Sequence, residues 1–199
     1  MSGGMAIPWF NVRKAAQIAA FFAREQGGEI NVLKLTKLVY IADRLNMDRY
    51  DFPISGDNFV SMDHGPVNSI TYSHINGMEG QCDQWSEFMT DRSGYRVGLV
   101  HNVSDDDLDE LSQADLETLH EVWAHFGNMN QFQIRDWTHD NCPEWEDPDG
   151  SSYPIAFERV LGFLNKPNAR EIADEIRSLR RVQEAFAAEV ELCPEKALA

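Results

Sequence analysis

Cysteine, basic residues and long apolar runs are all scarce in this chain of 199 residues. Its three cysteines, Cys82, Cys142 and Cys193, are widely spaced, so a disulfide framework is not expected and a reducing compartment is. No stretch approaches the roughly 18 apolar residues that a membrane span needs. Residues 1–10 lack the basic and apolar regions of a signal peptide. These absences predict a cytoplasmic protein without a membrane anchor.

The shortage of basic residues gives the chain a strong negative charge. Lys and Arg total 17 against 33 Asp and Glu, for a formal net charge of -16. A field of that sign repels nucleic-acid phosphates and anionic membranes, so neither is an expected partner, whereas a basic protein surface would be attracted. The sequence also lacks a phosphate loop, a dinucleotide fingerprint and a quartet of metal ligands. No cofactor is expected.

Apolar residues, in contrast, are plentiful enough for a core. Hydrophobic residues make up 43% and aromatic residues 11%, which lets one domain fold without disulfides or metals. Asn31 suits the cap of one helix, and Ser112 with Asp115 forms a near capping box at the start of another. Helical spacing of apolar side chains predicts helices over 11–26, after Asn31, and over 66–78, 113–126, 130–139, 155–164 and 169–190.

Strand signals are few. Residues 85–100 predict a hairpin, because a turn at 91–94 is followed by residues that alternate between apolar and polar. Residues 51–66 predict a loop with a short strand, and the proline-rich stretch 140–154 predicts a second loop. The predicted fold class is α+β: mainly α with a small hairpin or short sheet, as a compact helical domain plus a C-terminal amphipathic helix.

The last predicted helix carries an apolar stripe at the spacing of a short coiled coil. The stripe consists of Ile172, Ile176, Leu179, Val182 and Phe186. Burial on its own domain is favoured, with a second copy or a partner protein as the alternatives. The expected organisation is one domain over 1–166, with a helix and tail over 167–199 packed on that same domain.

Three segments follow one another in an order known from a protein family. LTKLVYIADRLNM at 35–47 resembles a helix of the form K-L-x-K-L-x-Y-x-A-D. DNFVSMDHGPVNSIT at 57–71 resembles a polar loop that ends in G-P-V, and IRDWTHDNCPEW at 134–145 resembles L-x-x-x-T-H-x-x-x-P-W. The ordered set resembles the Panacea (SocA-like) antitoxin domain over about residues 11–165. The helix from residue 168 onward goes beyond that pattern.

The resemblance implies a compact helical domain with a small β element, and a role as an antitoxin. Such a protein neutralises a cognate bacterial or phage toxin by direct binding. The alternative that the family offers is a proteolytic adaptor that delivers its toxin to a ClpXP-type protease. The partners implied are thus a toxin protein, basic if charge guides the pairing, and in the alternative a protease. The family pattern falls on Leu35, Lys37, Leu38, Tyr40, Gly65, Pro66, Thr138, His139, Pro143 and Trp145.

Three pairs of polar residues are candidates for contact with the partner. These are Asp43, Arg44, Asp63, His64, Arg177 and Arg180. For Asp43 and Arg44, anchoring of the 51–66 loop is the favoured alternative, since charges beside a core helix usually serve local pairing. For Arg177, an ion pair with Asp174 is the plain alternative.

An enzyme is not expected. Asp63 and His64 could form an acid-base pair, but adjacent side chains seldom meet, and no nucleophile motif such as GxSxG accompanies them. His139 and Cys142 fall short of the four ligands of a zinc site. A hydrolase that uses His64 or His139 stays a disfavoured alternative, and no catalytic or metal-binding residue is assigned.

Overall fold

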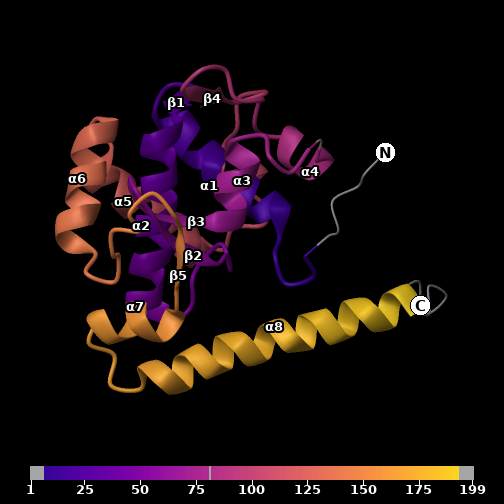
Figure 1. The fold of residues 1–199 in the computed structure, drawn as a ribbon. Helices are drawn as coiled ribbons and strands as arrows, with labels where there is room; N and C mark the ends of the chain where they lie inside the picture. Colours follow the sequence, from indigo (N-terminus) through magenta and orange to yellow (C-terminus); the bar gives the residue numbers. More distant parts are fainter. Residues whose placement is uncertain (1–6, 81, 193–199) are drawn as a thin grey trace.

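The computed structural model of the chain describes residues 7–80 and 82–192, and it confirms the α+β class. Helices surround the central α2, with small antiparallel sheets at two places on the body and the long α8 along one side (Figure 1). The elements are α1 (Val12–Glu25), β1 (Glu29–Asn31), α2 (Val32–Tyr50), β2 (Phe59–Met62), β3 (Gly65–Asn68), α3 (Ser69–Ile75), α4 (Asp83–Ser86), β4 (Arg96–Gly98), η1 (Asp105–Asp107), α5 (Gln113–Phe126), α6 (Gln131–Asn141), β5 (Tyr153–Ile155), α7 (Phe157–Phe163) and α8 (Ala169–Leu192).

Helix α2 is the centre of the fold because it is buried on nearly every side. It packs against α1, α5, α6 and β3, and even polar positions such as Thr36, Lys37 and Asp43 are enclosed. Its start is fixed by Asn31, whose side-chain oxygen accepts from the backbone N–H of Leu33 at 3.0 Å. That cap satisfies a donor that the first turn of a helix leaves free, as the sequence predicts.

The capping box predicted ahead of α5 is confirmed. The Ser112 N–H donates to the Asp115 carboxylate at 2.9 Å, and the Asp115 N–H donates to the Ser112 hydroxyl at 3.2 Å. Asn130 and Gln133 repeat the arrangement at the start of α6. Because both signals are local in sequence, they set these helix starts independently of tertiary packing.

The predicted hairpin over 85–100 is wrong in its first arm. Residues 83–86 form the helical turn α4, which turns Trp85 into the core. The second arm contributes β4, which pairs with β1 so that Ile30 faces Val97. Between the two arms only isolated bridges remain, such as Met89 with Leu99. Burial of Ile30 and Val97 together favours the distant strand over the neighbouring one.

The region around Pro66 also differs from its prediction. Pro66 lies in β3 opposite Ser61 of β2, and the helix predicted over 66–78 is α3, which begins at Ser69. Strand β2 also pairs with β5, which falls in the predicted 140–154 loop and extends one residue beyond it. The β2–β5 pairing joins segments far apart in sequence, so local periodicity could not indicate it.

A second apolar cluster holds the start of α8. Ile172, Ala173 and Ile176 are buried there with Val160 and Leu161 of α7. The predicted boundary at residue 166 falls between these two helices and stays a prediction. In the part of the chain that the structure describes, no helix is long and apolar enough to cross a membrane.

Candidate functional site

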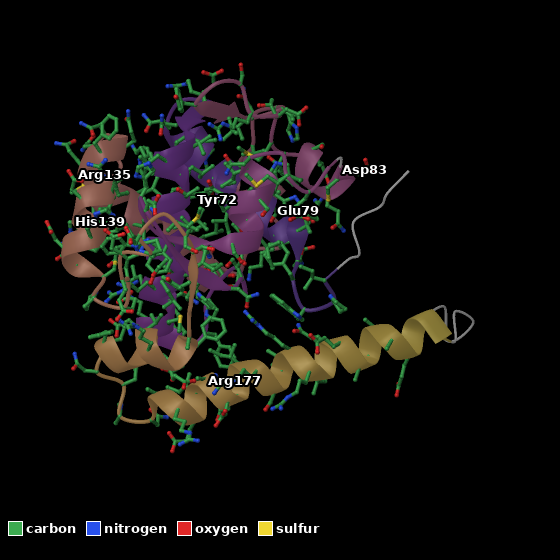
Figure 2. The ribbon with its side chains drawn as sticks, viewed as in Figure 1. Tyr72, Glu79, Asp83, Arg135, His139 and Arg177 are labelled. Atoms are coloured by element: carbon green, nitrogen blue, oxygen red, sulfur yellow. The ribbon has the colours of Figure 1, made fainter. Side chains whose placement is uncertain are left out.

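Side chains from three distant segments meet beside α2, at the turn between β2 and β3. The Lys37 ammonium donates to the Pro66 carbonyl oxygen at 2.8 Å. The Trp145 indole N–H donates to the Met62 carbonyl oxygen at 2.9 Å, and the His139 ring stacks on Trp145 with ring centroids 4.1 Å apart. Figure 2 places His139 on α6. We define the motif junction as Lys37, Gly65, Pro66, Thr138, His139 and Trp145.

Gly65 is required at the junction for both conformation and space. Its φ of +94° lies in the region that favours glycine. A Cβ atom added there would lie 2.8 Å from the Thr138 hydroxyl oxygen and 3.1 Å from the Lys37 ammonium. The hairpin backbone can approach α2 and α6 this closely because it carries no side chain at this position.

We therefore expect Gly65→Ala to lower the free energy of unfolding by about 2 kcal/mol or more, since strain and overpacking add. Gly77→Ala is the matched control, because its φ of +69° imposes strain but no atom lies within 4 Å of the added Cβ. The control should lose only about 1 kcal/mol. Urea unfolding of both variants measures the difference, and equal losses would contradict the crowding at Gly65.

Lys37, His139 and Cys142 lie close together, and burial disfavours the charged form of each. Burial lowers the pKa of Lys37 to about 7, and burial raises the pKa of the nearby Cys142 thiol to about 12. Burial, followed by the Lys37 charge, also lowers the pKa of His139. Among the described residues, Nε2 of His139 is buried without a hydrogen-bond partner. Above neutral pH the junction is thus largely uncharged.

A second polar cluster fixes the segment that carries Trp145. The Glu144 carboxylate is buried and accepts from the Tyr40 hydroxyl at 2.7 Å and from Nε of Arg44 at 2.6 Å. The Glu144 carbonyl in turn accepts from Arg159 of α7 at 2.9 Å. The cluster joins α2, the 142–146 turn and α7, so it holds the junction's third segment in place.

The loop before β2 is held by two buried carboxylates. Asp43 accepts from the backbone N–H of Ser55 at 2.9 Å and from the Asn68 amide at 2.6 Å, and burial raises its pKa to about 6. Asp57 accepts from the backbone N–H of Thr71 at 2.7 Å, and from Ile70 at 3.0 Å. Asp57 thereby accepts from the free N–H groups in the first turn of α3, where the cap residue Asn68 makes no side-chain capping bond.

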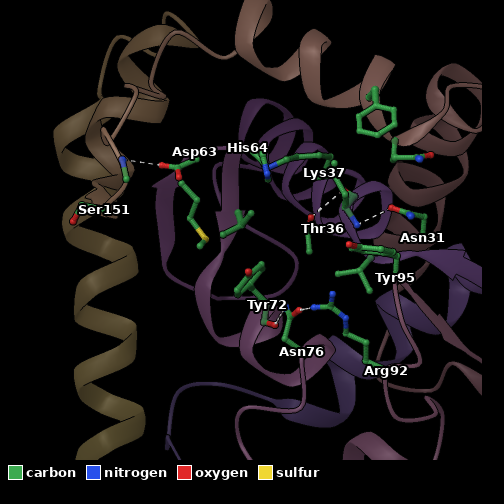
Figure 3. Close-up of a pocket in the computed structure, with 17 residues that line it drawn as sticks. Asn31, Thr36, Lys37, Asp63, His64, Tyr72, Asn76, Arg92, Tyr95 and Ser151 are labelled. Carbon is green, nitrogen blue, oxygen red and sulfur yellow. Dashed lines mark hydrogen bonds between the residues drawn. The ribbon is translucent and has the colours of Figure 1, made fainter.

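A cavity of about 610 Å³ opens beside the motif junction (Figure 3). This volume is within the range of sites that hold small molecules or side chains of a partner. Asp63 and His64 of the β2–β3 turn are exposed at the cavity. Tyr95 and Phe132 also line it, with 76% and 54% of their surface exposed. The wall is completed mainly by Asn31, Val32, Leu33, Thr36, Lys37, Met62, Val67, Tyr72, Asn76 and Arg92.

Two arginines of α8, Arg177 and Arg180, are engaged with their own chain. Arg177, labelled in Figure 2, pairs with Asp174 at 2.7 Å and with Glu158 at 2.8 Å. The Arg180 guanidinium donates to the Asp57 carbonyl at 2.9 Å and lies 4.1 Å above the centre of the Trp9 ring. Burial lowers the pKa of Arg180. These contacts attach α8 to the loop before β2.

The structure thus separates the six residues considered for partner contact. Asp43 is fully buried and Arg44 is paired with Glu144, so both take part in local pairing. Asp63 and His64 remain at the exposed mouth of the cavity. Asp63 accepts from the Gly150 backbone N–H at 3.1 Å, and no hydrogen bond joins it to His64 within the described residues. In that same part of the chain, no group of three or more His, Cys, Asp or Glu residues could hold a metal ion.

Of the family-pattern residues outside the junction, Leu35 and Leu38 belong to the buried core and Pro143 is exposed. Sequence reasoning missed Glu144, although it lies between Pro143 and Trp145 inside the third segment, where its position could have indicated a role. Arg92, Tyr95 and Phe132 at the cavity were missed as well. Their approach to the β2–β3 turn is tertiary, so no local pattern could have indicated it.

The fold and the site define a small α+β domain whose distant polar segments meet beside an open cavity. The family described as "Antitoxin SocA-like, Panacea domain" matches residues 35–146, which include the whole motif junction and the Tyr40–Glu144 cluster. The chain belongs to this family. No curated protein and no solved structure matches it.

Proposed function

We propose that the chain is an antitoxin that neutralises a cognate bacterial or phage toxin by binding it directly, as a binding module and not as an enzyme. Membership in an antitoxin family supports the role. The observation that carries the choice of surface is the cavity at the motif junction, with exposed aromatic rings at its mouth. Aromatic side chains beside a hollow are the groups that most often dominate the energy of a protein interface.

The docking surface that we propose is the cavity mouth, defined as Asp63, His64, Tyr95 and Phe132. Tyr95 and Phe132 supply apolar area, and each ring can bury it at a small cost in conformational entropy. Asp63 and His64 supply polar contacts at the rim. The turn that carries them is rigid, because Lys37 and Trp145 bond to its flanking carbonyl oxygens. A rigid surface binds without a large ordering cost.

Charge favours a basic toxin. With a net charge of -16, the chain attracts a positive protein surface, and this attraction accelerates association at low salt. Added salt screens the field over about 10 Å at 0.1 M. The association rate with the toxin is therefore expected to fall as salt is added.

The test is co-expression with the protein encoded by the neighbouring gene, scored for growth and for a stable complex. We expect Tyr95→Ser together with Phe132→Ser to weaken the complex at least about tenfold and to impair rescue, because both changes remove interface aromatics. Tyr50→Ser is the control, since Tyr50 is also exposed but lies about 27 Å along α2 from Val32.

Loss of rescue by the double variant, with the control unchanged, supports direct neutralisation at the cavity mouth. Rescue without a complex, accompanied by disappearance of the toxin, would instead support delivery to a protease. A neighbouring protein that is neither toxic nor bound would remove the antitoxin proposal for this chain.

A further inference from the structure

Helix α8 presents a row of large apolar side chains that the other described residues leave uncovered. The start of the predicted stripe, Ile172 and Ile176, is buried against α7. Farther along, Leu179, Val182 and Phe186 are 51%, 64% and 68% exposed. Three large apolar residues on one helix face, all more than half exposed, are unusual for a surface that meets only water.

The orientation of α8 explains why the body does not cover this row. Arg180 defines the side of the helix that faces the body, because its guanidinium reaches the Gly56 and Asp57 carbonyls. Successive residues of an α-helix are about 100° apart around the axis. Leu179 therefore lies well to one side of Arg180, and Val182 and Phe186 continue that flank. Figure 1 shows α8 as a long straight helix outside the rest of the fold.

The row has an acidic residue at each end. Glu175, Leu179, Val182, Phe186 and Glu189 follow one another at intervals of four, three, four and three residues, so they share one face of the helix. Both glutamates are exposed, and neither forms an ion pair within the described residues. The face therefore consists of an apolar centre between two exposed carboxylates.

We propose that this α8 face is a docking site for an amphipathic helix of a partner protein, with basic residues on both sides of its own apolar row. The three apolar residues supply the contact area, and Glu175 and Glu189 select a basic segment. The distance from Glu175 to Glu189 is about 21 Å along the axis, so a partner helix of about four turns fits.

A second copy of the chain fits the face poorly. In an antiparallel pair Glu175 of one copy would lie near Glu189 of the other, and in a parallel pair each glutamate would face its equivalent. Like charges at such positions oppose pairing, and each copy carries a net charge of -16. The same charges favour a basic helix at both ends.

This inference is independent of the proposed function. Helix α8 lies outside residues 35–146, which match the family, and the row is on a different part of the fold from the cavity mouth. Failure of toxin binding at Tyr95 and Phe132 would leave the α8 face untouched, and the reverse also holds.

The experiment measures binding of a labelled synthetic helical peptide to the full chain by fluorescence anisotropy. The peptide carries leucines at the spacing of the α8 row and lysines at both ends, and its twin carries glutamates instead. We expect the lysine peptide to bind at least about tenfold more tightly than the twin at low salt. Binding that is equal for the two peptides, or absent for the lysine peptide at about 1 mM, would overturn the proposal.

Variants locate the site. Phe186→Ser and Glu189→Lys should each weaken binding of the lysine peptide at least about fivefold, whereas Ala188→Ser and Glu184→Lys should leave it within about twofold, because Ala188 and Glu184 lie on the other side of α8. Equal losses in all four variants would contradict docking on this face. Light scattering of the free chain is the second measurement. A dimer that Phe186→Ser dissociates would show that a second copy covers the row, and would overturn the proposal.

Discussion

Replacement of Glu144 by alanine is expected to lower the free energy of unfolding by about 3 kcal/mol or more. The change removes the acceptor of both the Tyr40 hydroxyl and the Arg44 guanidinium, so that a buried hydroxyl and a partly buried charge lose their partner. Loss of one member of such a group costs more than the whole group contributes. Urea unfolding monitored by tryptophan fluorescence measures the loss.

The matched control is Glu146→Ala in the same turn. Glu146 is exposed and pairs with Arg159 at 2.6 Å, and exposed ion pairs contribute about 0–1 kcal/mol. Glu144→Gln should fall between the two, because the amide oxygen can still accept one hydrogen bond. A Glu144→Ala loss as small as that of the control would show that the Tyr40–Glu144–Arg44 cluster does not hold the turn.

The second large effect concerns Lys37 and pH. Burial lowers the pKa of Lys37 to about 7 from its ordinary 10.5, so between these values the unfolded chain binds one more proton than the folded chain. The free energy of unfolding must then rise with pH in this window, by up to about 1.4 kcal/mol per pH unit from this group. Below pH 7 the contribution is constant. Lys37→Met removes this slope.

Between pH 7 and 8.5 the slope of the free energy of unfolding against pH can be assigned to Lys37. Burial raises the pKa of Cys142 to about 12 and lowers the pKa of His139, so both shifts move titration of these groups in the folded chain away from this window. Urea unfolding of wild type and Lys37→Met at several pH values measures the difference in slope. Lys166→Met, which removes the ammonium that pairs with Asp51 at 2.9 Å, is the control and should keep the wild-type slope. Equal slopes in wild type and Lys37→Met would contradict the burial of a titrating lysine.

Local signals predicted most of the helices and several of their starts, but the helical turn α4 lies where a strand was predicted. Asn31 and Ser112 cap α2 and α5 as expected, because a capping side chain bonds to a backbone within three residues of itself. The pairing of the strands was harder to predict. Strand β4 pairs with β1 across more than sixty residues, and the alternating pattern of residues 95–99 does not specify which strand will be its neighbour.

The candidate site shows the same difference between features that the sequence indicates and features that only tertiary packing decides. The family resemblance indicated Lys37, Gly65 and His139, and the structure brings them together. Asp43 faces the interior because Ser55 and Asn68 enclose its carboxylate, and Arg180 is held by backbone carbonyl oxygens. Both environments are built by residues distant in sequence, so exposure could not be deduced from charge alone.

Hydrogen exchange of the free chain, and of the chain in complex with the proposed toxin, tests most directly whether the cavity mouth binds that protein. Slower amide exchange is expected in residues 62–67, 92–96 and 131–133, which surround the cavity mouth. The first of these segments is already bonded within β2 and β3, so protection there is expected mainly at the exposed turn. A complex that leaves all three segments unchanged, and that slows exchange only elsewhere, would contradict toxin binding at this cavity.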